Sequence, residues 1–248
     1  MSVSTESPNR RERLRAQTSD EIKAAARDQL IAHGPHGIQL RAVAREVGLT
    51  APALYRYFPS LEDLITELLA DLYLELAAAM QSAVDAAGGP VEVRLQIASR
   101  AFRGWAVDHP AEFALIFGAP LPGYVAPPDG PTQEAGSRFG AIFAGLFLEL
   151  WHERPFPVDD LERTDPGLAE AYAGYHTWLH DALAVEIPSG AIAVFIDAWV
   201  RLYGVISMEA FHHLDWCLLR PEDAEAVFER TLAGLCALWH ASETYRRP

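Results

Sequence analysis

The residues best suited to chemistry lie in one short segment, between positions 39 and 58. A helix-like stretch opens with Thr50-Ala51-Pro52-Ala53 and continues through Tyr55 and Tyr57. Small side chains at the start of a helix allow a close approach to base edges. A phenol on the exposed side can hydrogen bond to a phosphate while its ring packs on a sugar. These residue types predict contact with nucleic acid.

The charge is divided unevenly along the chain. The 248 residues contain 20 Lys and Arg against 34 Asp and Glu, a net charge of −14. Residues 1–59 carry nine basic and six acidic side chains, or +3, and the remainder carry −17. One end can therefore face a polyanion while the rest repels it. The alternative is that the arginines only keep the terminus soluble.

Hydrophobic periodicity is helical almost throughout, and strand signals are absent, so the fold class is all-α. The strongest period starts at Ser60 and ends before Gly88. Residues 119–131 contain five prolines and are expected to form a loop. We expect helices near 18–33, 40–47, 50–58, 60–87, 91–108, 110–118, 132–152, 165–186, 189–215 and 221–243. Thr18 and Glu21 have the spacing of a capping box for the first of these.

Two short helices joined by a tight turn at Gly48 form a helix-turn-helix pattern at 39–58, with Leu54 and Phe58 pointing inward. The pattern alone is common in helical proteins. The wording of residues 37–60 is more specific: GIQLRAVAREVGLTAPALYRYFPS, with its Leu-Tyr-Arg-Tyr-Phe ending, resembles the N-terminal DNA-binding domain of TetR-family transcriptional regulators.

This resemblance implies an all-α protein with three parts. They are a flexible basic tail at 1–17, a three-helix DNA-binding domain at 18–78, and a C-terminal ligand-binding and dimerisation domain at 79–248. It implies a homodimer on a palindromic double-stranded DNA operator, in most cases a repressor, released by a small-molecule effector. Two recognition helices held about 34 Å apart meet successive major grooves.

The resemblance also assigns DNA contacts. Arg41 matches a position that contacts base or backbone. The residues that match the reading and phosphate-contacting positions of the third helix are Thr50, Ala51, Pro52, Ala53, Tyr55 and Tyr57. Packing against neighbouring helices is the alternative role of the two tyrosines. Leu61 stands where the family usually has a phosphate-binding Lys, so only backbone N–H groups remain there.

The C-terminal part is rich in aromatic residues, most of them expected in the core. Together they make an apolar pocket for an apolar or aromatic effector plausible. The candidate lining residues are Trp105, Phe113, Phe117, Phe143, Phe147, Tyr175, Trp178 and Trp199. Arg103 and His176 are candidates to orient a ligand, with ordinary surface positions as the alternative.

The segment from Trp199 to Gly204, followed by Glu209, resembles a Trp–His–Gly signature of one TetR C-terminal subfamily, with Tyr203 in place of the His. The resemblance is used only for the position of this segment in the C-terminal domain, and no ligand chemistry is inferred from it. Helices near 189–215 and 221–243 have apolar residues on more than one face. The resemblance assigns them to the dimer interface, as a four-helix bundle with a second copy.

No catalytic residue, cofactor or metal site is predicted, since nucleotide-binding, hydrolase and zinc-protease motifs are absent from the sequence. Cys217 and Cys236 cannot form a disulfide scaffold. The polar N-terminus lacks a signal peptide, and no apolar run reaches about 18 residues, so a cytoplasmic location without a membrane span is expected. A helical enzyme and a protein-docking module remain as alternative functions.

Overall fold

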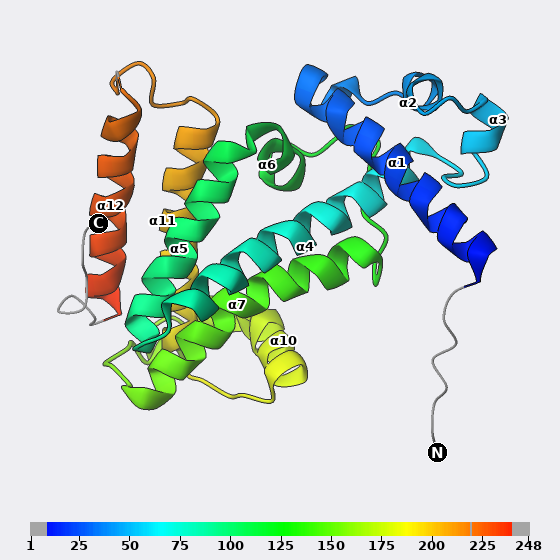
Figure 1. Ribbon diagram of the computed structural model, residues 1–248. Coiled ribbons are helices and arrows are strands. Elements are labelled where there is room, and N and C mark those ends of the chain that lie inside the picture. Colours follow the sequence, from blue (N-terminus) through cyan, green and yellow to red (C-terminus); the bar gives the residue numbers. More distant parts are fainter. Residues whose placement is uncertain (1–8, 219, 240–248) are drawn as a thin grey trace. The chain divides into compact units, whose positions relative to one another are not determined.

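The computed structural model describes residues 9–218 and 220–239, and every element in this part of the chain is helical. Figure 1 labels the main helices, and their contacts divide the chain into two compact units. Unit 1 contains residues up to 75 together with 109–137, and unit 2 contains 76–108 together with residues from 138 onward. Two long helices, α4 (Leu61–Ala87) and α7 (Pro131–Glu153), contribute residues to both units.

Unit 1 is built around α1 and the first half of α4. Its remaining elements are η1 (Pro35–Gly37), α2 (Leu40–Glu46), α3 (Ala51–Leu54), α6 (Pro110–Phe117) and the start of α7. The apolar faces of these helices form its core, which includes Ile22, Leu30, Val43, Leu54 and Leu64. The periodic leucines of α4 are buried as their spacing predicts.

The first helix starts earlier than the sequence pattern indicates. α1 runs from Arg10 to His33, so residues 10–17 are helical and not a flexible tail; residues 1–8 lie outside the described part. Asn9 caps it through a reciprocal capping box with Glu12. The expected cap at Thr18 is wrong, because the Thr18 hydroxyl donates to the Leu14 carbonyl (3.0 Å) inside the helix. Gly34 ends α1 at φ 72°, as expected.

Unit 2 contains α5 (Val91–Asp108), most of α7, and the C-terminal helices. These are α8 (Leu161–Thr164), α9 (Pro166–Ala171), α10 (Ala173–Leu183), α11 (Ser189–Ala210) and α12 (Pro221–Leu238). The single helix expected at 165–186 is broken at Tyr172, and α8 was not expected. α11 ends at Ala210, shortly before His212 adopts a left-handed φ of 59°. Residues 240–243 of the last expected helix lie outside the described residues.

Two buried ion pairs tie α5 to the C-terminal helices of unit 2. Arg100 donates two hydrogen bonds to Glu229 on α12 (2.8 and 2.9 Å), and Arg103 donates two to Glu209 on α11 (2.8 and 2.7 Å). Both carboxylates are largely buried, so the bidentate pairing satisfies charges that would otherwise be costly to desolvate. α5, α11 and α12 therefore form one packed layer (Figure 1).

α11 combines a length of 22 residues with high hydropathy, although charged residues interrupt its apolar run as the sequence indicates. It is the one described helix that is long and apolar enough to span a membrane, with a mean hydropathy of 1.6 over 18 residues. Before its last turn α11 contains two charged residues, Asp197 and Arg201, which form an ion pair of 2.9 Å. Because the other residues of that stretch are uncharged, its mean hydropathy stays high. The packing of α11 on α5 and α12 accounts for part of this apolar surface.

Candidate nucleic-acid interface

The second and third helices pack against each other around a tight turn. Gly48 has a φ of 68°, which a side chain would strain, and the Leu49 N–H donates to the Ala44 carbonyl (2.8 Å). Leu54 and Phe58 are buried behind α3, as expected. These contacts fix α3 from its inner side and leave its outer side to solvent.

α3 is shorter than expected. Its helix covers four residues, and tight hydrogen bonds continue the turn, among them the Tyr57 N–H to the Leu54 carbonyl (2.8 Å). Pro59 disfavours helical geometry in the residue before it, which limits the helix. Thr50 stands at the N-cap, but its side chain makes no capping hydrogen bond. Its hydroxyl is therefore not engaged in holding the helix.

The predicted DNA-contacting residues all lie in unit 1, and their exposure differs. Thr50, Pro52 and Tyr55 are exposed, Tyr55 by 47%. Arg41, at the start of α2, is also exposed, whereas Ala51 and Ala53 are half-buried. Since Ala51 and Ala53 have only a methyl group, the backbone of α3 can approach a surface closely.

Tyr57 differs from Tyr55 in being half-buried. The guanidinium of Arg15 lies 5.9 Å from the centre of its ring, within the range of a cation–π contact. Tyr57 thus combines a packing role with a position at the edge of the exposed surface. The sequence pattern gave no sign of Arg15, because the expected helix start placed it in a flexible tail.

The first turn of α4 does not favour phosphate. The Asp63 N–H donates to the Ser60 hydroxyl (3.1 Å), and that hydroxyl donates to the Asp63 carboxylate (2.8 Å). Glu62 and Asp63 add two negative charges to this turn. With Leu61 in place of the usual Lys, only the backbone N–H groups of this turn could bind a phosphate. The two carboxylates repel a phosphate and oppose that contact.

The predicted ligand-lining aromatics are divided between the two units. Phe113 and Phe117 lie on α6 in unit 1, with ring centroids 5.0 Å apart. In unit 2, Tyr175 stacks on Trp178 at 5.3 Å. The others of unit 2 are Trp105, Phe143, Phe147 and Trp199. The structure therefore does not gather all eight residues within one unit.

Three predicted residues, Phe143, Phe147 and Trp199, line one small apolar cavity in unit 2. Its volume is about 20 Å³, enough for one water molecule. Trp239, which the sequence pattern did not single out as a ligand residue, also lines it. The Trp239 Nε1 is buried and lacks a hydrogen-bond partner within the described part of the chain.

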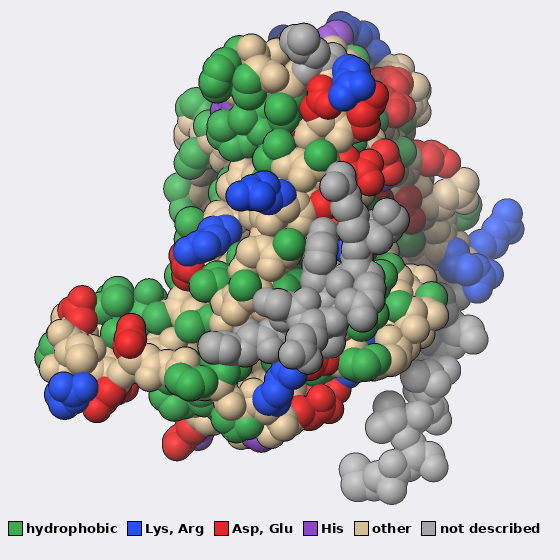
Figure 2. All heavy atoms as spheres, turned by 90° about the vertical axis from the view of Figure 1, so that its left-hand side faces the viewer, with side chains coloured by type: hydrophobic (Ala, Val, Ile, Leu, Met, Phe, Trp, Pro, Cys, Tyr) green, Lys and Arg blue, Asp and Glu red, His purple; other side chains and the backbone are tan. Residues whose placement is uncertain are grey.

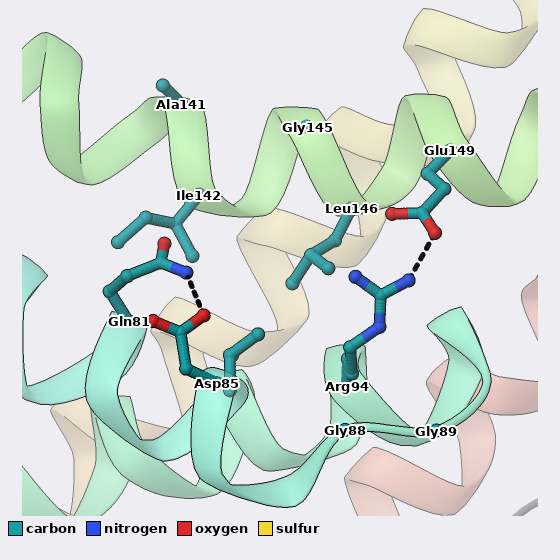
Figure 3. Close-up of a pocket in the computed structure, with 11 residues that line it drawn as sticks. Gln81, Asp85, Gly88, Gly89, Arg94, Ala141, Ile142, Gly145, Leu146 and Glu149 are labelled. Atoms are coloured by element: carbon teal, nitrogen blue, oxygen red, sulfur yellow. Dashed lines mark hydrogen bonds and ion pairs between the residues drawn. The ribbon is translucent and has the colours of Figure 1, made fainter.

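A larger groove of about 490 Å³ lies elsewhere in unit 2, between the end of α4, the start of α5 and α7. In Figure 3 the side chains of Gln81, Asp85 and Arg94 face those of α7, with Arg94 paired to Glu149 and Gln81 hydrogen bonded to Asp85. The predicted ligand residues are not among those that line it. Gln81 and Asp85 satisfy each other, whereas the buried Arg94 Nε has no hydrogen-bond partner within the described residues.

The two polar residues proposed to orient a ligand are engaged with protein groups. The Arg103 guanidinium makes two hydrogen bonds to Glu209, which leaves it committed to an ion pair. His176 Nε2 lies 3.0 Å from the Ser189 hydroxyl, and that hydroxyl donates to Glu162 (2.7 Å). This hydrogen bond lowers the pKa of the Glu162 carboxyl.

His176, Ser189 and Glu162 do not have the order of a catalytic triad. The carboxylate accepts from the hydroxyl and not from the imidazole, and Ser189 is buried. Burial also raises the pKa of the Cys236 thiol to about 11, so it stays protonated at neutral pH. Among the residues that the structure describes, no group of three His, Cys, Asp or Glu side chains is arranged to hold a metal ion.

Comparison with known proteins identifies the chain through both of its parts. Residues 22–68 match a family model described as bacterial regulatory proteins, tetR family, and residues 95–235 match one described as a tetracyclin repressor-like C-terminal domain. HTH-type transcriptional regulator Rv1816 from Mycobacterium tuberculosis and Mb1846 from Mycobacterium bovis are each 34% identical over 208 residues, covering 82% of this chain and 84% of theirs. The chain belongs to the TetR family.

Solved structures support this TetR-family assignment. Regulatory protein SCO4313 is 30% identical, with a TM-score of 0.69 over 93% of this chain and 100% of that one. A protein of unknown function from Rhodococcus sp. RHA1, 22% identical, shares the fold with a TM-score of 0.59 over 88% of this chain and 94% of its own. The chain is a transcriptional regulator of the TetR family; the Trp–His–Gly subfamily stays a prediction.

Arg41→Ala and Tyr55→Ala should each weaken operator binding of this TetR-family regulator about 5- to 150-fold, the range for removal of one base or phosphate interaction. Both side chains are exposed, so the free energy of unfolding should change by less than about 0.5 kcal/mol. A mobility-shift titration measures the affinity, with the exposed Arg163→Ala as a control from unit 2. Unchanged affinity would remove the residue concerned from the interface.

Proposed function

We propose that this TetR-family regulator is a repressor that binds a palindromic operator as a homodimer and leaves it when a small apolar effector binds. The observation that supports DNA reading most directly is the surface of α3. Thr50, Pro52 and Tyr55 are exposed there while Leu54 and Phe58 anchor the segment from behind. A rigidly held helix with a free outer side is what reading of a major groove requires.

The proposed base-reading group is the start of α3, and the proposed phosphate-contacting group surrounds it. Ala51 and Ala53 admit the backbone close to the bases, and the uncommitted Thr50 hydroxyl can donate to or accept from a base edge. Arg41 and the two tyrosines are proposed to bond phosphates, which would fix the register on the duplex.

Dimerisation is proposed through α11 and α12. These two helices pack together in unit 2, and α11 presents Val200 (59% exposed) and Met208 (38% exposed) to solvent. On the face of the molecule that carries α12, hydrophobic side chains lie between separated charged ones (Figure 2). A second copy would cover this apolar surface and combine two half-site affinities into one.

The effector is proposed to enter the aromatic core of unit 2 at the cavity lined by Phe143, Phe147 and Trp199. Because that space holds about one water molecule, a larger ligand must displace these rings, which couples binding to helix movement. The unsatisfied Trp239 N–H favours an apolar molecule with one hydrogen-bond acceptor. α4 runs through residues of both units, so a shift in its second half would reach the reading segment.

Incubation of the pure protein with fragmented genomic DNA should enrich one or a few fragments that contain an inverted repeat. Affinity for these fragments should fall steeply with salt, with a slope of about −0.9 per phosphate contacted. Sedimentation should show two copies of the chain per operator. We propose that the protein binds its operator in the cytoplasm.

The same assay tests the effector. A compound that raises the midpoint of thermal unfolding should also release the operator fragment, because it favours one of two states. If the protein remained monomeric, or retained no fragment at low salt, the proposed function would be wrong. Retention that ignores salt would instead favour an apolar protein-docking surface at the helix-turn-helix.

A further inference from the structure

A second basic surface adjoins the helix-turn-helix in unit 1. It is an open groove of about 590 Å³ between the N-terminal part of α1 and the residues that follow α3. The residues that line it are Arg10, Arg11, Leu14, Arg15, Thr18, Arg56 and Tyr57. Four of the seven carry a guanidinium, and none carries a carboxylate.

The α1 side of this groove is a regular helix face. Residues 10, 11, 14, 15 and 18 share one side of an α-helix, since neighbours three and four apart stack along it. From Arg10 to Thr18 the row is about 12 Å long at a rise of 1.5 Å per residue. The capping box of Asn9 and Glu12 starts the helix just before this row and holds it in place.

The four guanidinium groups of the groove are not paired with carboxylates. In contrast to Lys23 and Arg27, which pair with carboxylates on α4 and α6, Arg10, Arg11, Arg15 and Arg56 have no acidic partner within 4.0 Å in the described part of the chain. Four like charges that line one groove repel one another. A polyanion would relieve this repulsion and release its own counterions.

The position of the groove indicates which polyanion. Arg56 and Tyr57 come just after Tyr55, the C-cap residue of α3, and the Arg15 guanidinium lies over the Tyr57 ring. The groove is therefore continuous with the proposed reading surface. A row of about 12 Å can follow more than one phosphate of a strand, which are spaced about 3.4 Å apart along the duplex axis. The first turn of α4, which follows these residues in the chain, is acidic and does not offer an alternative phosphate site.

We propose that this arginine groove binds backbone phosphates of DNA that flanks the half-site, so that α1 extends the footprint beyond the bases read by α3. The inference rests on the proposed DNA-binding function and adds a contact surface to it. Because guanidinium groups contact phosphate whatever the base, the contribution depends on the presence of flanking DNA and not on its sequence.

The test uses the full-length protein and an operator fragment that it retains. Three duplexes are compared: the inverted repeat alone, the repeat extended by about 6 base pairs (roughly 20 Å) on each side, and the same extension with scrambled flanks. Wild type should bind both extended duplexes equally and more tightly than the short one. The Arg10→Ala/Arg11→Ala/Arg15→Ala variant should bind the extended duplexes about tenfold or more weakly and lose the length advantage.

The salt dependence gives a second readout. The slope of log affinity against log salt should become shallower in the triple variant by about 1 for each phosphate that it no longer binds. Arg13→Ala is the matched control, because Arg13 belongs to the same turn of α1 but does not line the groove; it should change affinity less than about threefold. The corresponding triple change to Lys keeps the charge and should retain most of the length advantage, and circular dichroism checks that α1 stays helical.

The outcomes separate the two proposals. If wild type retains no DNA, the proposed function fails and the groove inference fails with it. If wild type binds its operator but the alanine variant binds all three duplexes like wild type, the groove inference is overturned and the regulator remains. A triple variant that changes the dimer equilibrium and leaves the length advantage intact would assign the groove to a protein contact, which also overturns the inference.

Discussion

Arg27→Ala should lower the free energy of unfolding by about 3–5 kcal/mol, the cost of breaking a buried ion pair. Arg27 on α1 donates to Glu112 on α6 (2.9 Å) and twice to Glu75 on α4 (2.6 and 3.0 Å). The Glu112 side chain is 4% exposed. Without Arg27 a desolvated carboxylate is left without its charged partner, and three helices of unit 1 are no longer joined through one side chain.

Urea unfolding followed by circular dichroism measures this effect. Arg163→Ala is the matched control, because Arg163 forms an exposed i,i+3 pair with Asp160 outside the proposed dimer helices and its removal should cost less than about 1 kcal/mol. Adding Glu112→Gln to Arg27→Ala should recover part of the stability, since the unpaired charge disappears. A loss below about 1 kcal/mol for Arg27→Ala would show that the network contributes little.

Phe102→Ala should destabilise unit 2 by about 3–5 kcal/mol. The Phe102 side chain is 0% exposed, and its ring contacts Phe139 at 5.3 Å, Phe143 at 6.1 Å and Trp199 at 5.8 Å between centroids. Removal of the ring leaves a cavity lined by aromatic residues that rigid helices cannot close. It also removes one of the two rings that stack on Trp199, the other being Tyr203, so the tryptophan fluorescence of the folded protein should change.

Phe102→Leu provides the comparison for this prediction. Leucine fills most of the volume, so its cost should be clearly smaller than that of alanine. The alanine cavity is apolar and should stay dry, so a small aromatic such as benzene should bind and raise the unfolding midpoint of the variant more than that of wild type. Equal stability of Phe102→Ala and wild type would mean that the aromatic core is not tightly packed.

The reading segment could be predicted from sequence because its determinants are local. Gly48 supplies a positive φ at the turn, and Leu54 and Phe58 alternate with exposed Tyr55 at helical spacing. The long apolar period of α4 and the proline-rich loop after α6 are likewise local signals. The family resemblance rested on the same residues, and the comparisons confirm the family and the all-α class. The individual DNA and ligand contacts stay predictions.

The start of α1 shows where local reasoning reached its limit. The sequence pattern predicts a cap at Thr18 with Glu21, and the same spacing at Asn9 with Glu12, earlier in the chain, was not singled out. The structure forms the cap at Asn9, and the Thr18 hydroxyl turns back to the helix. This choice converts Arg10, Arg11 and Arg15 from tail residues into one wall of a groove.

The sequence by itself determined most of the long helices, the position of the turn in the reading segment and which end of the chain is basic, because these depend on neighbours within one or two turns. Only the tertiary structure decided which charged side chains form ion pairs. Arg27 finds its partners 48 and 85 residues away, and Arg103 finds Glu209 106 residues away. Such pairings depend on how helices pack, and no periodicity encodes them.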